Sequence, residues 1–172
     1  ELRCAPLATA ALQQALTQAG FDTANAEGLA TLSEGSAGDA IRLLRHDGLS
    51  LYASLVRLFE GLPRIDRSAA LKLADSCAAR GADTHYGLTL DLIDQFLART
   101  ARAGLFGEPY SQGAPHEARL LARLSPDDHA ARAWAQVQQD LSGRVRHGRA
   151  VNLDPAALIL DIIFKIEETA HK

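Results

Sequence analysis

Apolar side chains recur at spacings of three and four residues along almost the whole chain, which is the pattern of helices with one buried face. No stretch shows a sustained alternation rich in Val, Ile and Thr, the pattern that indicates a half-buried strand. The periodicity therefore predicts an all-α protein. The expected helices cover residues 10–19, 24–34, 37–46, 49–62, 68–80, 84–104, 116–125, 127–148 and 152–172.

Residues that can cap a helix stand before most of these segments. A side-chain oxygen at the cap accepts a hydrogen bond from an N–H group of the first turn, and Pro is favoured at the first helical position. Within the long helices, Gly143 is a candidate for an interruption. The expected starts are Thr9, Thr23, Ser36, Asp66 or Arg67, Asp83, Ser125 and Asp154, with Pro126 and Pro155 opening the last two helices.

The lengths of the expected helices divide the chain into two parts. Residues 1–47 hold three short helices, whereas residues 48–172 hold longer and more apolar ones. The stretch 104–116 collects several Gly and Pro residues and predicts an exposed loop, the most flexible segment of the chain. We therefore expect a small three-helix domain followed by a helical bundle.

The charge balance argues against a dedicated nucleic-acid-binding domain. The chain of 172 residues has 18 basic and 21 acidic side chains and a formal net charge of -3, whereas such domains are strongly basic. The short basic run 143–149, GRVRHGR, is interpreted as a solvated connector, with phosphate contact as the alternative. We expect no direct nucleic-acid partner.

The cysteines and the hydropathy indicate the compartment. Cys4 and Cys77 lie far apart without a CxxC spacing or a His partner, so neither a disulfide framework nor a zinc site is indicated. No apolar run approaches the roughly 20 residues that span a bilayer, and no signal-peptide pattern stands at the start. We expect a cytoplasmic protein without a membrane partner. The chain begins at Glu1 and contains no Met, which indicates a piece of a longer protein.

Three groups of polar residues could suggest chemistry. Asp91 with Asp94, and Glu167 with His171, each share a helix face, but a metal or acid/base site needs further ligands from other helices. We interpret both pairs as solvated helix faces. The run 127–129, Asp-Asp-His, follows Ser-Pro, where the helix dipole favours acidic side chains. We predict no metal ion, no cofactor and no catalytic residue.

Cys77 and Trp134 are expected in the core. No His or Lys adjoins Cys77 to lower the pKa of its thiol, and a single Trp at helical spacing is more typical of a core than of a ligand platform. No Ser/His/Asp set and no GxGxxG motif suggests itself. From the residues alone, we predict an all-helical protein that acts through interactions.

Three segments carry a resemblance to a known family. Residues 2–4 read Leu-Arg-Cys, and residues 29–44 read LATLSEGSAGDAIRLL. They resemble the end of the AAA+ module in bacterial clamp loaders, where a Ser-Arg-Cys element precedes a three-helix lid whose last helix opens with a Gly-Ser-x-Arg-Asp-Ala sensor sequence. The closing segment 152–172, with Asn-Leu-Asp-Pro before an apolar helix, is similar to the last helix of delta-prime-type members. The resemblance implies an AAA+ lid over 1–47 and a helical collar domain over 48–172.

The resemblance also implies roles for single residues. Gly35, Ser36, Gly38 and Asp39 match the frame of the sensor sequence, but Gly38 stands where the family's arginine meets the phosphates of the nucleotide. Such a replacement resembles the delta-prime-type subunits, which do not hydrolyse ATP. Arg3 would be the arginine finger that acts in the ATP site of a neighbouring subunit, although the residue before it is Leu rather than the family's Ser.

A chain of this kind would be a non-catalytic fragment of the clamp loader of bacterial DNA polymerase III, the DNA-directed nucleotidyltransferase of replication. Its collar would join the ATPase subunit and the delta subunit in a ring of five subunits while the sliding clamp is loaded. Two alternatives stay open. One is the lid and collar of the ATP-hydrolysing subunit or of another AAA+ protein; the other is an all-helical ligand-binding regulator or enzyme with a central pocket.

Overall fold

The computed structural model describes residues 5–21 and 23–171. Within these ranges all regular structure is helical and no strand occurs, so the predicted all-α class is confirmed. The helices of this part of the chain are α1 (Thr9–Gln18), α2 (Ala26–Leu32), α3 (Ala37–Arg45), α4 (Gly48–Glu60), α5 (Arg67–Ala78), α6 (Asp83–Phe106), α7 (Glu117–Leu124), α8 (Asp128–Ala150) and α9 (Pro155–Ala170).

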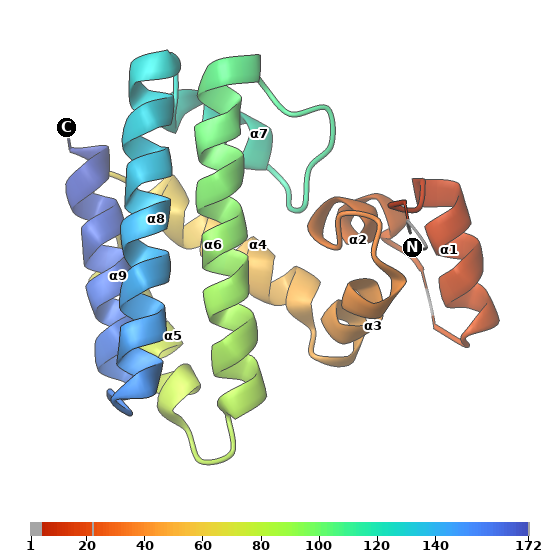
Figure 1. Cartoon of the computed structure of the whole chain (residues 1–172), viewed down its shortest axis with the longest axis horizontal. Coiled ribbons are helices and arrows are strands. Elements are labelled where there is room, and N and C mark those ends of the chain that lie inside the picture. The colour runs from red at the N-terminus through yellow and green to blue at the C-terminus, as the bar shows by residue number, and fades with distance from the viewer. Residues whose placement is uncertain (1–4, 22, 172) are drawn as a thin grey trace.

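Three long helices form the larger part of the molecule. α6, α8 and α9 lie side by side, and α8 runs antiparallel to both of its neighbours (Figure 1). α5 packs against α9 and α6, and α7 packs against α6 and α4. The result is an antiparallel bundle in which each helix buries an apolar stripe against the others.

Large apolar side chains fill the centre of this bundle. Phe96 of α6 is fully buried, and its ring centroid lies 4.8 Å from that of Phe59 in α4. Trp134 and Cys77 are also buried, as expected, and the indole Nε1 of Trp134 donates a hydrogen bond to Leu124 O at 2.8 Å. Each large apolar side chain buried in this way stabilises the fold by about 1.5–3 kcal/mol relative to exposure.

The three short helices α1–α3 pack on one another on the side of α6 that faces away from α8 and α9 (Figure 1). α4 packs against α3 and against α6 and α7, so it connects the short helices to the bundle. The division of the chain at residues 47 and 48 into two domains stays a prediction. The short helices bury one apolar face each, formed by Leu12, Leu16, Leu29, Leu32, Ala40 and Leu43.

Three of the seven expected helix starts are side-chain caps at the predicted residue. Ser36, Asp66 and Asp154 accept hydrogen bonds from first-turn N–H groups of α3, α5 and α9, and Pro155 is the first residue of α9. The other expected starts are wrong by one or two residues. At α2 and α8 a competing residue nearby supplies the cap, whereas α1 and α6 begin after an alanine that forms no side-chain cap. Helix α1 already includes Thr9, α2 is capped by Asn25 instead of Thr23, α6 already includes Asp83, and α8 is capped by Asp127 instead of Ser125.

Two glycines lie inside helices that we expected them to end or interrupt. α6 continues through Gly104, and α8 is continuous at Gly143. A Cβ atom on Gly104 would lie closer than 3.0 Å to Asp127 O and 2.9 Å from Ala131 Cβ. Gly104 therefore lets α6 approach the start of α8, whereas nothing lies within 4 Å of a Cβ placed on Gly143.

The segment between α6 and α7 is shorter than predicted and only partly exposed. It covers 107–116 and runs from the end of α6 toward the side of α2 before it returns to α7 (Figure 1). Gly113 and Ala114 are buried in it. The expectation of an exposed loop is wrong for these two residues, and the reason is the buried carboxylate described below.

Candidate functional site at the start of α3

The sensor-like segment, residues 35–39, forms the turn into α3. Gly35 has a φ of 78°, which glycine adopts without strain. Ser36 is the N-cap, and its Oγ accepts a hydrogen bond from the N–H group of Asp39 at 3.3 Å. Asp39 lies in the first turn, where the helix dipole favours a negative charge. The predicted turn and the Ser36 cap are confirmed.

Gly35 is required by its surroundings as well as by its φ angle. The N–H group of Leu7 donates a hydrogen bond to Gly35 O at 3.0 Å, so the chain before α1 lies against this turn. A Cβ atom on Gly35 would stand 2.7 Å from both Leu7 N and Leu7 O. No side chain fits between the two backbones.

Gly38 has the opposite surroundings. It is exposed in the first turn of α3, and a Cβ atom there would meet only Ser36 Oγ at 4.0 Å. Its backbone has no positive φ that would favour glycine. The fold therefore leaves room for a side chain at this position, and packing does not explain why the residue is glycine.

The two glycines of this segment make a matched pair for mutation. We expect Gly38→Ala to raise the free energy of unfolding by about 0.5–1 kcal/mol, because alanine restricts the unfolded chain and favours the helix. Gly35→Ala should lower it by about 1–3 kcal/mol through strain and overlap with Leu7. Urea unfolding followed by circular dichroism measures both values. Equal effects of the two substitutions would show that the described surroundings do not control this turn.

Ion pairs connect α3 to the long helix α6. Arg42 Nη1 lies 2.7 Å from Asp91 Oδ2, and Arg42 Nε lies 3.8 Å from Asp39 Oδ1. All three side chains are roughly half exposed, so each pair contributes only about 0–1 kcal/mol. Their main effect is to hold the side chain of Arg42 toward α6.

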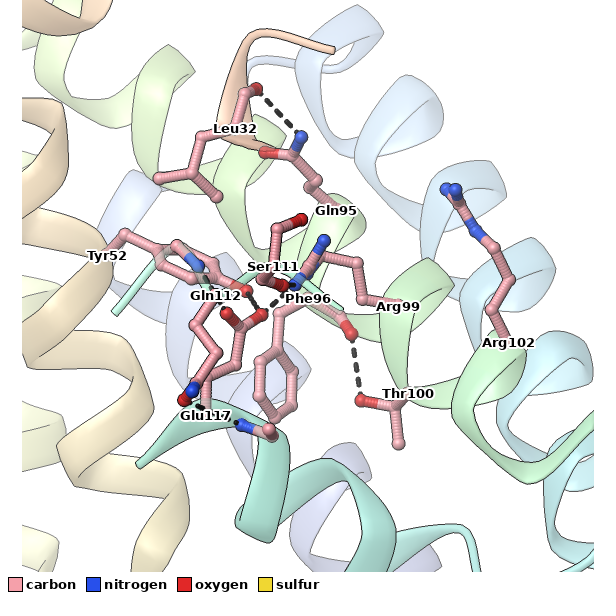
Figure 2. A network of polar contacts seen from close by, with 12 residues as sticks. Leu32, Tyr52, Gln95, Phe96, Arg99, Thr100, Arg102, Ser111, Gln112 and Glu117 are labelled. Atoms are coloured by element: carbon pink, nitrogen blue, oxygen red, sulfur yellow. Dashed lines mark hydrogen bonds and ion pairs between the residues drawn. The ribbon is translucent and has the colours of Figure 1, made fainter. Parts of the chain in front are cut away.

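A row of polar side chains on α6 faces the short helices and the loop. Asp91, Gln95, Arg99 and Arg102 follow one another at spacings of three and four residues, which places them on one helix face. Gln95 Nε2 donates a hydrogen bond to Leu32 O at 2.8 Å (Figure 2), and Arg102 Nη2 lies 3.5 Å from Glu34 Oε1. A polar hollow of about 370 Å³ lies along this contact.

The most buried part of this polar face is the carboxylate of Glu117, which has no solvent exposure. Tyr52 Oη donates to its Oε1 at 2.5 Å, Arg99 Nε donates to the same oxygen at 2.6 Å, and Gly113 N donates to Oε2 at 2.6 Å. Arg99 Nη2 also donates to Ser111 O at 2.8 Å. Figure 2 shows how side chains from α4, α6 and α7 converge on this carboxylate. The network attaches the 107–116 loop to three helices.

This environment shifts the pKa values of the two side chains that bind Glu117. Burial raises the pKa of Tyr52 well above its ordinary value, and the negative charge and hydrogen bond of Glu117 raise it further. Burial disfavours the charge on Arg99, but the hydrogen bond and the charge of Glu117 outweigh this effect and raise its pKa. The network thus keeps Tyr52 neutral and Arg99 charged.

The shifted pKa of Tyr52 predicts a loss of stability in alkali. The folded chain retains the Tyr52 proton, whereas the unfolded chain loses it above pH 10.0. The contribution of neutral Tyr52 to the free energy of unfolding is therefore complete below pH 10.0. Above this pH the free energy of unfolding decreases by at most about 1.4 kcal/mol per pH unit.

We expect Tyr52→Phe to flatten the decrease of the free energy of unfolding above that pH, as measured by urea unfolding over an alkaline series. Tyr110→Phe, at an exposed tyrosine, is the control and should leave the slope of the wild type unchanged. Equal slopes for the wild type and Tyr52→Phe would contradict the burial of the phenol.

Two of the carboxylates that we expected on solvated faces have structural partners. Asp94 accepts hydrogen bonds from Ser142 Oγ at 2.8 Å and from Gln138 Nε2 at 3.2 Å. Glu167 is buried, where it accepts a hydrogen bond from Ile65 N at 3.1 Å and lies 2.6 Å from Arg67 Nη2. The expectation of solvated faces is wrong here because neighbouring helices cover both positions. Exposed Asp91 and His171 agree with it.

The described residues offer little for bond-making chemistry. They contain no group of three or more His, Cys, Asp or Glu side chains that could hold a metal ion. Burial raises the pKa of the Cys77 thiol, which disfavours the nucleophilic thiolate. Asp127 caps α8 and Asp128 lies in its first turn, so the run 127–129 has the structural role that we predicted. No helix in the ranges 5–21 and 23–171 is long and apolar enough to cross a membrane.

The sequence-based reading of the site has two gaps. Arg3, the expected arginine finger, lies outside the described residues. The buried network of Tyr52, Arg99 and Glu117 was not predicted, because its members stand on amphipathic helices and are separated by up to 65 residues. The one local signal is the position of Glu117 directly after the Gly- and Pro-rich loop, in the first turn of α7.

Comparisons of the chain with models of protein families, with curated proteins and with solved structures give no match.

Proposed function

We propose that this chain is the C-terminal part of a non-catalytic, delta-prime-type subunit of a bacterial DNA polymerase III clamp loader, which acts in the cytoplasm. The observation that carries the proposal is the open, exposed position of Gly38 in a helix start that is otherwise intact. A sensor arginine would fit there without repacking, so its absence has a chemical meaning rather than a steric one.

The charges at the start of α3 support a segment that does not bind phosphate. A helix N-terminus attracts a phosphate group when its N–H groups are free and a cation stands nearby. Here Ser36 Oγ accepts a hydrogen bond from one of these N–H groups, that of Asp39. The side chain of Asp39 also places a negative charge in the first turn. Two arginines lie close to this segment, and both face carboxylates: Arg42 pairs with Asp91, and Arg102 lies near Glu34. We infer that the lid keeps its shape but contributes no nucleotide contact.

The bundle of α4–α9 supports a role as a scaffold. Its long helices and its tightly packed core suit a collar that keeps a ring of subunits in register, and the partners would be the ATPase subunit and the delta subunit. Several large apolar side chains of the bundle stay exposed, and a partner could cover some of them. They are Leu71, Leu105, Phe106, Tyr110, Val151, Leu153 and Phe164.

A nucleotide-binding measurement tests the sensor argument. We expect isothermal titration calorimetry of the chain with ATP and Mg²⁺ to give no heat of binding at ATP concentrations up to the millimolar range. A dissociation constant of about 1 mM corresponds to a binding free energy of about -4 kcal/mol. Gly38→Arg should fold normally, because the position is open, and serves to test whether a cation alone restores contact. Micromolar binding by the unaltered chain would contradict the proposal and would favour a lid from the ATP-hydrolysing subunit.

The alternative of a ligand-binding regulator or enzyme has one observation in its favour, the polar hollow between α3 and α6. Four carboxylates line it, but each is engaged by the chain itself. Arg42 lies near Asp39 and Asp91, Arg102 lies near Glu34, and Ser142 donates a hydrogen bond to Asp94. Apart from the buried Glu117 network, apolar side chains fill the interior of the bundle. The scaffold role therefore agrees better with this arrangement.

A further inference from the structure

A predominantly apolar groove of about 540 Å³ lies between α4 and α5. We call it the α4–α5 groove. Leu51 and Leu58 of α4 and Leu73 of α5 contribute its apolar lining. Leu73 is half-buried, whereas Leu51 and Leu58 are buried in the core and reach the groove with only 9% and 7% of their surface exposed. The two leucines of α4 stand seven residues apart, which places them on one helix face.

Both helices that border the groove pack on α6, but the other neighbours of each helix are different. α4 packs on α3, α6 and α7, whereas α5 packs mainly on α9 and α6, and the two make little direct contact with each other. The lining residues on this side extend from Leu51 in α4 to Gly61, the residue directly after α4, which is roughly 15 Å at about 1.5 Å per residue. A slot of this length between two helices can receive about three turns of a further helix.

Two cations border the groove on opposite walls, Arg57 on α4 and Lys72 on α5. Both side chains are exposed, and neither has an ion-pair partner within residues 5–21 and 23–171. One carboxylate, that of Asp66, also lines the groove. It accepts hydrogen bonds from the backbone N–H groups of Ser68 and Ala69. The groove therefore combines an apolar centre with one positive charge on each wall and a single carboxylate, so its lining carries a net positive charge.

We propose that the α4–α5 groove binds an acidic amphipathic helix of a partner protein. The apolar face of that helix would contact Leu51, Leu58 and Leu73, and carboxylates along its two edges would pair with Arg57 and Lys72. Apolar area would supply affinity, and the two charges would select acidic over basic segments. The inference rests on α4 and α5 alone and does not depend on the clamp-loader proposal.

A charge-swap experiment tests this site. The probe is a fluorescein-labelled helical peptide of about three turns, with Leu along one face and Glu along both edges; a matched probe carries Lys in place of Glu. In anisotropy titrations of the full chain we expect the Glu probe to bind and the Lys probe to bind at least about tenfold more weakly. The double variant Arg57→Glu with Lys72→Glu should reverse this order.

The control has the same change of charge elsewhere on the surface. Arg80→Glu with Arg146→Glu alters two exposed arginines outside the groove and should leave the affinity for both probes unchanged. Circular dichroism verifies that each variant is folded. Equal binding of the two probes, or no binding of either, would overturn the proposal. So would a dimer in sedimentation velocity that the Arg57/Lys72 variant abolishes, because the occupant would then be a second copy of this chain.

Discussion

Replacing Glu117 by Ala is expected to lower the free energy of unfolding by about 3–5 kcal/mol, because it leaves a buried arginine without its counter-charge. The side chain of Arg99 is 13% exposed and that of Glu117 is 0% exposed. The variant also removes the acceptor of Tyr52 Oη and of Gly113 N, two further buried donors. An unsatisfied buried donor costs about 1–3 kcal/mol.

Urea unfolding of the variant measures this loss, and two further variants define its cause. Glu117→Gln keeps an oxygen acceptor and should lose only part of the stability of Glu117→Ala, about 1–3 kcal/mol. Glu108→Ala removes an exposed carboxylate from the same loop and should change stability by less than about 0.5 kcal/mol. A loss below about 1 kcal/mol for Glu117→Ala would contradict a central role of the network.

Gly104→Ala and Gly143→Ala are expected to change stability in opposite directions. Both residues lie inside long helices, where alanine is favoured over glycine by about 0.5–1 kcal/mol. At Gly143 this preference acts alone, so we expect stabilisation of that size. At Gly104 the added methyl group would overlap Asp127 O and Ala131 Cβ, and we expect destabilisation by about 1–3 kcal/mol.

The difference between the two variants is the informative quantity, since helix preference cancels in it. Thermal and urea unfolding of both proteins give that difference under identical conditions. If Gly104→Ala were as stable as Gly143→Ala, then α6 and the start of α8 would not approach each other as closely as described.

The helices themselves could be predicted because their information is local. A spacing of three and four residues between apolar side chains identifies a buried face, and the positions of Ser36, Asp66 and Asp154 identify three helix starts. The starts of α1 and α6 were missed because an alanine without a side-chain cap precedes each helix. Two further starts were missed where two suitable residues compete. Asn25 stands two residues after Thr23, and Asp127 stands two residues after Ser125, and the choice between them depends on how the helix packs.

The buried polar network could not be predicted, because the contacts that define it are not local. Glu117 reads as a surface residue of an amphipathic helix, and only the packing of α4, α6 and α7 covers it. The same holds for Glu167, whose partners Ile65 and Arg67 are distant in sequence. The length of α6 was underestimated for a related reason, since the closeness of α8 explains the glycine at position 104.

The sensor-like segment is the part of the site that the sequence described best. The turn, the cap and the first-turn carboxylate all stand where the pattern placed them. The structure adds the distinction between Gly35, which the neighbouring backbone requires, and Gly38, which nothing requires. That distinction gives the proposed loss of a phosphate contact its physical basis.

Co-assembly with clamp-loader subunits tests the central claim most directly. The measurement is size-exclusion chromatography with light scattering of this chain mixed with the full-length ATPase subunit and delta subunit from the same source. We predict that the chain elutes in a complex with both subunits and that Gly38→Ala joins it equally well, because assembly depends on the bundle rather than on the start of α3. Separate elution of the chain from both full-length partners would contradict the account.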